Sequence, residues 1–191
     1  MKIENLTKKY NDQLVLDHIN MEFEDGKKYG LMGPSGSGKT TLLHIILGLE
    51  KADDGTVSGL EQKKAAAVFQ EDRLCEAFSA LENVAMVTNE LSKEQIREEL
   101  SQLLPMDSID KPVKNLSGGM KRRVAVCRSL LAPSDMIIMD EPFTGLDENT
   151  KKAVIQYIVK KTKGKMLIIS THNEEDIAAL GGELIKLDGY C

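Results

Sequence analysis

Hydrophobic and polar residues alternate along the first part of the chain. Between residues 15 and 24, apolar side chains can face inward while the residues between them face water, which predicts a strand with one buried face. The inward-facing residues are Leu16, Ile19, Met21 and Phe23. Residues 2–6 form a second expected strand, followed by a polar turn over residues 7–12. Asp25-Gly26 favours a hairpin turn into a short buried strand at residues 28–32, so an antiparallel sheet is expected to precede residue 33.

From residue 71 to residue 114 the pattern becomes helical and polar. Apolar residues recur at helical spacing over 81–87 and 93–104, and Pro105 and Pro112 interrupt the helices. Farther along the chain, short apolar runs alternate with helical segments, which predicts parallel strands linked by helices. The strands are expected at residues 56–57, 65–69, 136–140, 166–170 and 183–187, and the later helices at 119–131, 149–163 and 173–180.

The composition is that of an ordinary globular protein. A length of 191 residues is enough for one α/β domain with a small subdomain. The net charge of −5 argues against a nucleic-acid partner, and the basic run Lys121-Arg122-Arg123 is interpreted as a solvated helix face. We recognise no secretion signal and no apolar run long enough to span a membrane. Cys75, Cys127 and Cys191 form no metal or redox motif and suggest a reducing cytosol.

One polar segment interrupts the periodic patterns. Residues 33–40 fit the phosphate-loop pattern G-x-x-x-x-G-K-[ST] at every fixed position, with a short strand before them and a buried helix expected after them. Backbone N–H groups at such a helix N-terminus attract phosphate, Lys39 adds a positive charge near the β- and γ-phosphates, and Thr40 offers a hydroxyl to Mg²⁺. The segment predicts a nucleoside triphosphate site rather than a chance Gly/Ser-rich turn. The residues expected to hold the nucleotide are Gly33, Pro34, Ser35, Gly36, Ser37, Gly38, Lys39, Thr40 and Thr41.

Two further segments are candidates for the same chemistry. Asp140 and Glu141 end an apolar strand, and ligands of an open α/β sheet bind at the carboxyl ends of its strands. Asp140 can hold Mg²⁺ through water, and Glu141 can polarise a water that attacks the γ-phosphate; a solvated acidic pair is the alternative. Ser117 can cap the helix that follows it, and Gly118 and Gly119 expose the first N–H groups of that helix, although Ser-Gly-Gly alone favours a flexible turn.

Three more positions complete an ordered series of motifs. The phosphate loop is followed by Gln70, then by Leu116-Ser117-Gly118-Gly119, Asp140-Glu141, Leu146-Asp147 and His172. In this order, and over essentially the whole chain, the sequence resembles the ATP-binding subunit of ABC transporters. The resemblance implies an α/β fold, with a P-loop NTPase core of mostly parallel sheet, an N-terminal antiparallel β-subdomain and a small helical insert. The single domain would span residues 1–191, with the core at 1–70 and 116–191 and the insert at about 71–115.

The resemblance also implies a role for each matching residue. Tyr10 would stack on adenine, Gln70 would touch Mg²⁺ and the attacking water, and His172 would contact the γ-phosphate. Ser117, Gly118 and Gly119 would contact ATP held by a second subunit, and Asp147 would lie in a loop that crosses the dimer interface. The expected catalytic residues are Glu141, His172, Gln70 and Lys39, and the expected Mg²⁺ residues are Thr40, Gln70 and Asp140.

The implied function is ATP hydrolysis in a head-to-tail dimer that drives solute transport. The expected partners are a second ATP-binding subunit, forming a homodimer when ATP is bound, integral-membrane permease subunits that dock near residues 71–78, and a solute-binding protein. The protein would be cytoplasmic and peripheral on the inner face of the membrane. The alternative is an ABC ATPase that drives a mechanical process at the cell envelope or in cell division. A GTPase or a small-molecule kinase is disfavoured, because the sequence has no Asn-Lys-x-Asp base reader and no recognisable phosphate-acceptor site.

The chain departs from the family pattern at Met120, where a glutamine is usual. Methionine cannot supply the amide of that glutamine, but the preceding Ser117, Gly118 and Gly119 are intact. ATPase activity is therefore expected to survive this change.

Overall fold

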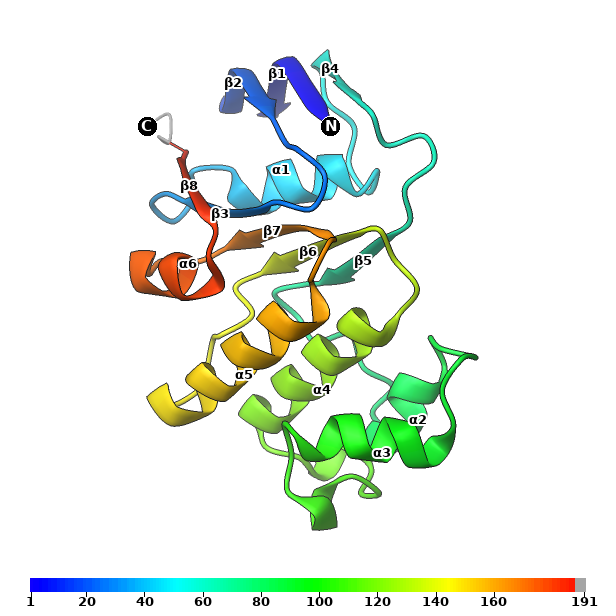
Figure 1. The fold of residues 1–191 in the computed structure, drawn as a ribbon. Coiled ribbons are helices and arrows are strands. Elements are labelled where there is room, and N and C mark those ends of the chain that lie inside the picture. The colour runs from blue at the N-terminus through cyan, green and yellow to red at the C-terminus, as the bar shows by residue number, and fades with distance from the viewer. Residues whose placement is uncertain (188–191) are drawn as a thin grey trace.

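A computed structural model describes residues 1–187 and shows two sheets with helices between and below them (Figure 1). The smaller sheet is antiparallel, in the strand order β2-β1-β4. Its strands are β1 (Lys2–Tyr10), β2 (Gln13–Glu22) and β4 (Asp54–Ser58). The larger sheet has five parallel strands in the order β5-β6-β7-β3-β8. These are β3 (Lys28–Met32), β5 (Ala65–Val68), β6 (Met136–Asp140), β7 (Met166–Ser170) and β8 (Glu183–Lys186). The expected combination of a parallel core and an antiparallel β-subdomain is confirmed.

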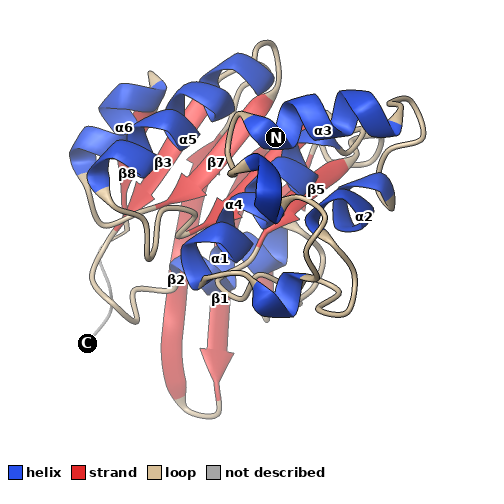
Figure 2. Ribbon diagram, turned by 90° about the horizontal axis from the view of Figure 1, so that it is seen from below, coloured by secondary structure: helices blue, strands red, loops and turns tan. Residues whose placement is uncertain are grey.

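Helices cover both faces of the parallel sheet. Helix α1 (Lys39–Ile46) lies between the two sheets, while α4 (Gly118–Leu131), α5 (Glu148–Lys161) and α6 (Glu174–Leu180) cover the opposite face (Figures 1 and 2). Alternate residues of the central strands point to opposite faces, so each strand feeds two cores. Ile138 and Ile168 pack with α1, whereas Ile137 and Leu167 pack toward α4 and α5. This two-sided burial explains the unbroken apolar runs of β6 and β7.

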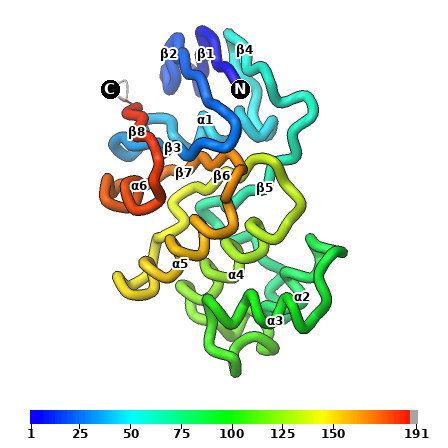
Figure 3. The backbone as a smooth tube through the Cα atoms, in the orientation of Figure 1, coloured from blue at the N-terminus to red at the C-terminus, as the bar shows by residue number. Residues whose placement is uncertain are grey.

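The segment between β5 and α4 contains two short α-helices. They are α2 (Ala80–Ala85) and α3 (Lys93–Ser101), followed by the single 3₁₀ turns Met106–Ser108 and Val113–Asn115. Both α-helices begin with a capping box, formed by Ser79 with Glu82 and by Ser92 with Gln95. Figure 3 shows the chain leaving β5, forming this segment and returning to the core through α4.

The expected hairpin between the strand at 15–24 and the strand at 28–32 is wrong. The hairpin partner of β2 is β1, joined through a turn at Asn11-Asp12 in which Asn11 has φ +53°. The expected turn at residues 7–12 is correspondingly shorter, because β1 extends to Tyr10. The segment around Asp25-Gly26 instead carries the chain from one sheet to the other. Strand β3 hydrogen-bonds to β7 on one side and β8 on the other, which leaves no free edge for β2.

Candidate nucleotide-binding site

The phosphate loop, residues 33–40, connects β3 to α1 at the carboxyl edge of the parallel sheet. Gly38 is the N-cap of α1 and has φ +88°, a conformation that favours glycine. A Cβ atom on Gly33 would lie 2.3 Å from the carbonyl oxygen of Leu187, so the loop also needs glycine for close approach. With this geometry, the N-terminus of α1 and its unpaired N–H groups face the end of the sheet.

A cavity of about 410 Å³ lies over this loop. It is lined by residues from five separate segments of the chain: Tyr10, Gln13, Val15, Ser35, Gly36, Ser37, Gly38, Lys39, Thr40, Thr41, Gln70, Asp140, Glu141 and His172. The cavity therefore brings together most of the residues singled out in the sequence. Gly33 and Pro34 are not among its lining residues; their carbonyl oxygens accept hydrogen bonds from Lys39 Nζ at 2.7 and 3.0 Å.

Asp140 is a buried carboxylate held by two hydroxyl groups. Thr40 Oγ1 donates to Asp140 Oδ2 at 2.7 Å, and the Ser170 hydroxyl donates to Asp140 Oδ1. The two strands are in register here, with Asp140 opposite Ser170. The sequence analysis did not assign Ser170 to the site. Its hydroxyl group ends the strand next to β6, and this position could have indicated a contact with Asp140. Thr40 and Asp140 present hard oxygen atoms to the cavity, and the buried Ser170 fixes Asp140 in place.

Glu141 turns away from Asp140 and toward His172. Its backbone adopts φ +49°, and its N–H group donates to Ser170 Oγ at 2.9 Å. One carboxylate oxygen, Oε1, lies 3.1 Å from His172 Nε2. Burial raises the pKa of the Glu141 carboxyl above its ordinary value, against the opposing influence of His172; the neighbouring Asp140 charge raises it further. A carboxyl with a raised pKa is suited to accept a proton near neutral pH.

Gln70 follows β5 and is held in place from below by α4. Arg122 donates from Nη1 to the carbonyl of Phe69 at 2.6 Å and from Nη2 to the carbonyl of Gln70. Arg122 is only 5% exposed, and its Nε lies 3.3 Å from Asp72 Oδ1. The interpretation of the basic run at 121–123 as a solvated face is therefore wrong for this residue. A planar guanidinium can donate hydrogen bonds to two carbonyl groups at once. The positive charge of Arg122 therefore did not imply that its side chain is solvated.

The antiparallel hairpin supplies the outer wall of the cavity. Tyr10 and Gln13 are paired across the turn that joins β1 to β2, and Val15 follows on β2. Tyr10 is 43% exposed, with Lys8 Nζ 5.2 Å from the centre of its ring. An exposed aromatic ring at the rim of a cavity offers a flat apolar face to a ligand. Gln13 and Val15 were missed because the position of this hairpin was not predicted.

The remaining predicted residues do not reach this cavity. Ser117 caps α4 and accepts from the Met120 N–H group at 3.3 Å, while Asp147 caps α5 and accepts from the Thr150 N–H group at 3.0 Å. A Cβ atom on Gly118 would have no neighbour within 4 Å, whereas one on Gly119 would lie 3.1 Å from the carbonyl oxygen of Gly145. The Ser-Gly-Gly loop and the loop before Asp147 thus adjoin each other, away from the chain's own phosphate loop.

Neither cysteine of the described residues lines the cavity. Cys75 and Cys127 are free thiols, and Cys191 lies outside the described residues. Within residues 1–187, no group of three or more His, Cys, Asp or Glu side chains could hold a metal ion. In the same range, no helix is both long enough and apolar enough to cross a membrane.

The chain is similar in sequence to proteins of a known family. Residues 16–144 match the family model described as ABC transporter. The Nod factor export ATP-binding protein I of Cupriavidus metallidurans is 33% identical, over 98% of this chain and 68% of its own length. The sulfate/thiosulfate import ATP-binding protein CysA of Neisseria meningitidis serogroup A is 32% identical, over 97% of this chain and 58% of its own length. The chain therefore spans between about three fifths and two thirds of these two curated relatives.

Solved structures give the same result. The dimeric structure of MJ0796, a bacterial ABC transporter cassette, superposes with a TM-score of 0.86 at 29% identity, covering 98% of this chain and 94% of the cassette. Its post-hydrolysis state bound to ADP and Pi superposes with a TM-score of 0.83 at 27% identity, covering 100% of this chain and 96% of the cassette. On its sequence, its fold and its phosphate-loop cavity, the chain belongs to the ABC transporter family, as an ATP-binding subunit and an ATPase.

Proposed function

We propose that the cavity over residues 33–40 holds ATP with its triphosphate on the phosphate loop. The N–H groups at the start of α1 would bind the β-phosphate, and Lys39 would exchange its bonds to the Gly33 and Pro34 carbonyls for phosphate oxygens. Adenine would stack on Tyr10 at the rim. The observation that carries this proposal is the single cavity shared by Tyr10, the phosphate loop, Asp140, Glu141 and His172.

The donor set beside the phosphate loop fits Mg²⁺. The Thr40 hydroxyl, the Asp140 carboxylate and the Gln70 amide are hard oxygen donors, and all three residues line the cavity. Mg²⁺ usually takes one or two protein oxygens and fills its shell with water and substrate phosphates, so an all-protein cage is not required. When bound, the ion would neutralise charge on the phosphates. Asp140 would hold its place through the hydroxyl groups of Thr40 and Ser170.

Hydrolysis would use Glu141 as the general base. The Glu141 carboxylate accepts a proton from water, the water oxygen bonds to the γ-phosphorus, and the bond from that phosphorus to the β–γ bridging oxygen breaks, which leaves ADP and phosphate. His172, 3.1 Å from Glu141 Oε1, would hydrogen-bond the γ-phosphate. Gln70 would orient the water. Lys39 would stabilise charge on the transferring group.

The site would be completed by a second copy of the chain, arranged head to tail. Ser117, Gly118 and Gly119 lie outside their own chain's cavity, and the space beside Gly118 is open, as a partner's γ-phosphate would require. Asp147, whose loop adjoins Gly119, would cross the same interface. The dimeric structure of the similar cassette supports a dimer. ATP would close the dimer, and loss of the bridging phosphate would let it open.

Dimer closure would drive permease subunits in the membrane, and the chain would be a cytoplasmic protein attached to the inner membrane face through them. Their docking site would lie around residues 71–78, beside Gln70, where Phe78 is 46% exposed. A solute-binding protein would be a further partner if the system imports. The two relatives described above are ATP-binding proteins for export and import, so transport is favoured over a mechanical role at the cell envelope.

Substitution of Glu141 by Gln tests the proposal. The Glu141→Gln chain should bind ATP with the affinity of the unchanged chain, lose turnover by about a hundredfold or more, and accumulate as a dimer when size is measured with ATP. Glu183→Gln, which removes a 61% exposed carboxylate at the start of β8, is the control and should change neither property. A Glu141→Gln chain that keeps its turnover and remains a monomer with ATP would show that Glu141 is not the base.

A further inference from the structure

The turn that carries His172 is held by one buried hydroxyl group. Thr171, the residue before His172, donates from Oγ1 to Asp176 Oδ2 at 3.2 Å, and the N–H group of Asn173, the residue after it, donates to the same Oγ1 at 3.3 Å. Both neighbours of His172 are therefore attached to Asp176 through Thr171. The His172 side chain itself is 57% exposed, so packing does little to fix its direction. Its position depends on the backbone of this turn.

Asp176 is in turn fixed by Lys151. The carboxylate is on the first turn of α6 and is only 4% exposed, and its Oδ1 lies 3.2 Å from Lys151 Nζ. The Lys151 ammonium also contacts Glu148 Oε1 at 2.9 Å. A buried carboxylate is costly unless it is paired, so Asp176 is stable in this position because Lys151 and Thr171 serve its two oxygens.

Lys151 connects this arrangement to the loop at Asp147. It lies on the first turn of α5, and its N–H group donates to the carbonyl of Asp147 at 2.8 Å. Figures 1 and 2 show α5 and α6 next to each other on one face of the parallel sheet. A chain of direct contacts therefore runs from Asp147 through Lys151, Asp176 and Thr171 to the backbone of His172.

We propose that Asp176 and Lys151 are positioning residues for ATP hydrolysis: their ion pair holds His172 within reach of Glu141 and ties it to the Asp147 loop. The inference rests on the proposed role of His172 at the γ-phosphate. In the dimer, Asp147 would face the partner and His172 would face the nucleotide, so the ion pair would join the interface to the reacting group. Displacement of a positioned group by about 1 Å is enough to slow an enzyme by about a hundredfold.

Two substitutions break the pair while sparing the nucleotide cavity. Asp176→Asn keeps the shape of the side chain and removes its charge, and Lys151→Met keeps the apolar stem and removes the ammonium. In both variants we expect kcat to fall by about tenfold or more, with KM for ATP and direct ATP binding changed by less than about twofold. Because both residues act through one contact, the double variant should lose no more activity than either single variant. Asp176→Glu should recover part of the loss.

Glu174→Gln is the matched control. Glu174 is a carboxylate of the same helix turn, 59% exposed and paired only at the surface with Lys186 at 3.4 Å. Its removal should leave kcat unchanged. If Asp176→Asn or Lys151→Met fails to fold, Thr171→Val removes the hydroxyl that attaches both sides of the turn and should lower kcat with the same unchanged KM.

Imidazole NMR signals separate positioning from catalysis. The chain has three histidines, His18, His44 and His172, so the His172 signal can be assigned with a His172→Asn variant. That signal should move farther in Asp176→Asn than in Glu174→Gln, whose carboxylate lies near His172 but does not hold its turn, with His44 as an internal reference. An unmoved signal in Asp176→Asn would overturn the inference. A moved signal with a kcat loss no larger than that of the control would show that Asp176 positions His172 but that hydrolysis does not need this position, and it would overturn the proposed role of His172 together with the inference that rests on it.

Discussion

Asp140 and Glu141 are adjacent in sequence but have different surroundings. Both oxygens of Asp140 accept hydrogen bonds from hydroxyl groups, which fix the position of this carboxylate beside Thr40. Glu141 is rotated by its positive φ toward the cavity, where His172 is its close partner. The two carboxylates are therefore suited to different work, Asp140 to holding a cation and Glu141 to accepting a proton.

The raised pKa of Glu141 predicts the pH dependence of turnover. A general base must be ionised, and burial favours its neutral form, so kcat/KM should fall as the pH decreases through a value above the ordinary glutamate pKa of 4.5. The measurement is kcat/KM against pH, with ATP binding followed over the same range as the control. The expectation is wrong if activity stays constant down to pH 4.5, or if ATP binding is lost at the same pH as turnover.

At the level of residues, the sequence predicted the fixed positions of the motifs, but it did not predict the residues that hold those positions in place. The phosphate loop, Asp140 and Glu141 were recognisable because spacing and side-chain chemistry define them. Arg122 was not, because a basic residue on a helix is usually solvated, and only the packing of α4 against β5 brings it to the backbone carbonyls of Phe69 and Gln70. Tertiary contacts of this kind leave no periodic signal.

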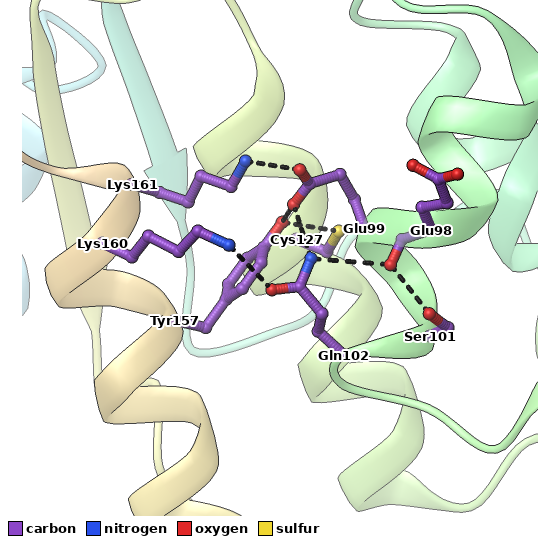
Figure 4. A network of polar contacts seen from close by, with 8 residues as sticks. All are labelled: Glu98, Glu99, Ser101, Gln102, Cys127, Tyr157, Lys160 and Lys161. Atoms are coloured by element: carbon purple, nitrogen blue, oxygen red, sulfur yellow. Dashed lines mark hydrogen bonds and ion pairs between the residues drawn. The ribbon is translucent and has the colours of Figure 1, made fainter.

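At the scale of elements, a polar junction joins α3 to α5 (Figure 4). Glu99 of α3 accepts from Tyr157 Oη at 2.8 Å and from Lys161 Nζ at 2.6 Å. Burial alone would raise the pKa of the Glu99 carboxyl, but the hydrogen bonds from Lys161 and Tyr157 outweigh it and lower that pKa. Cys127 of α4 lies beneath, 3.6 Å from Tyr157 Oη, and burial raises the pKa of its thiol to about 12. The junction attaches the helices between residues 71 and 115 to the core.

Removal of the Tyr157 hydroxyl should loosen this junction. Tyr157→Phe keeps the buried ring and deletes one donor to Glu99, so we expect the free energy of unfolding to fall by about 1–2 kcal/mol, measured by urea denaturation. Asp110→Asn, which breaks the exposed 2.6 Å pair with Arg97, is the control and should cost less than about 1 kcal/mol.

The pH dependence gives a second check on the junction. A depressed carboxyl pKa stabilises the folded state above the unfolded pKa of about 4.5, and this contribution is lost as the pH falls through the folded value. The difference between the unchanged chain and a Glu99→Gln variant should therefore shrink below pH 4.5. A difference that does not change with pH would mean that the Glu99 charge contributes nothing.

Strands of the parallel sheet that are buried on both faces could be predicted from the sequence. Strands β6 and β7 were expected with their observed limits, because an unbroken apolar run between polar ends has few alternatives. The pairing of β2 was not predictable in the same way. A turn sequence such as Asp25-Gly26 permits a hairpin, but whether the next strand pairs locally depends on the more distant β7 and β8.

At the scale of the whole molecule, the residues predicted to function fall on two separate surfaces. The cavity over the phosphate loop gathers most of them, whereas Ser117 to Gly119 and Asp147 lie together elsewhere. The order of the motifs in the sequence indicated this division only through resemblance to a family. The structure gives a physical reason for this division. Gly119 lies next to Gly145, so the Ser-Gly-Gly loop and the loop before Asp147 form one surface that a second chain can contact.

Ser117→Arg is the test of this division. An arginine at the N-cap of α4 would fill the open space beside Gly118 and replace the cap, but it would leave the residues of the chain's own cavity unchanged. We expect turnover to be lost while the ATP affinity of the monomer stays within about twofold of the unchanged chain. Introduced into the Glu141→Gln chain, the substitution should also abolish the ATP-dependent dimer seen by size measurement. Lys39→Ala is the contrasting variant, because it should weaken ATP binding by the monomer itself. If Ser117→Arg instead weakened monomer binding as Lys39→Ala does, the Ser-Gly-Gly loop would have to act on its own chain's nucleotide, and the head-to-tail dimer would lose its physical basis.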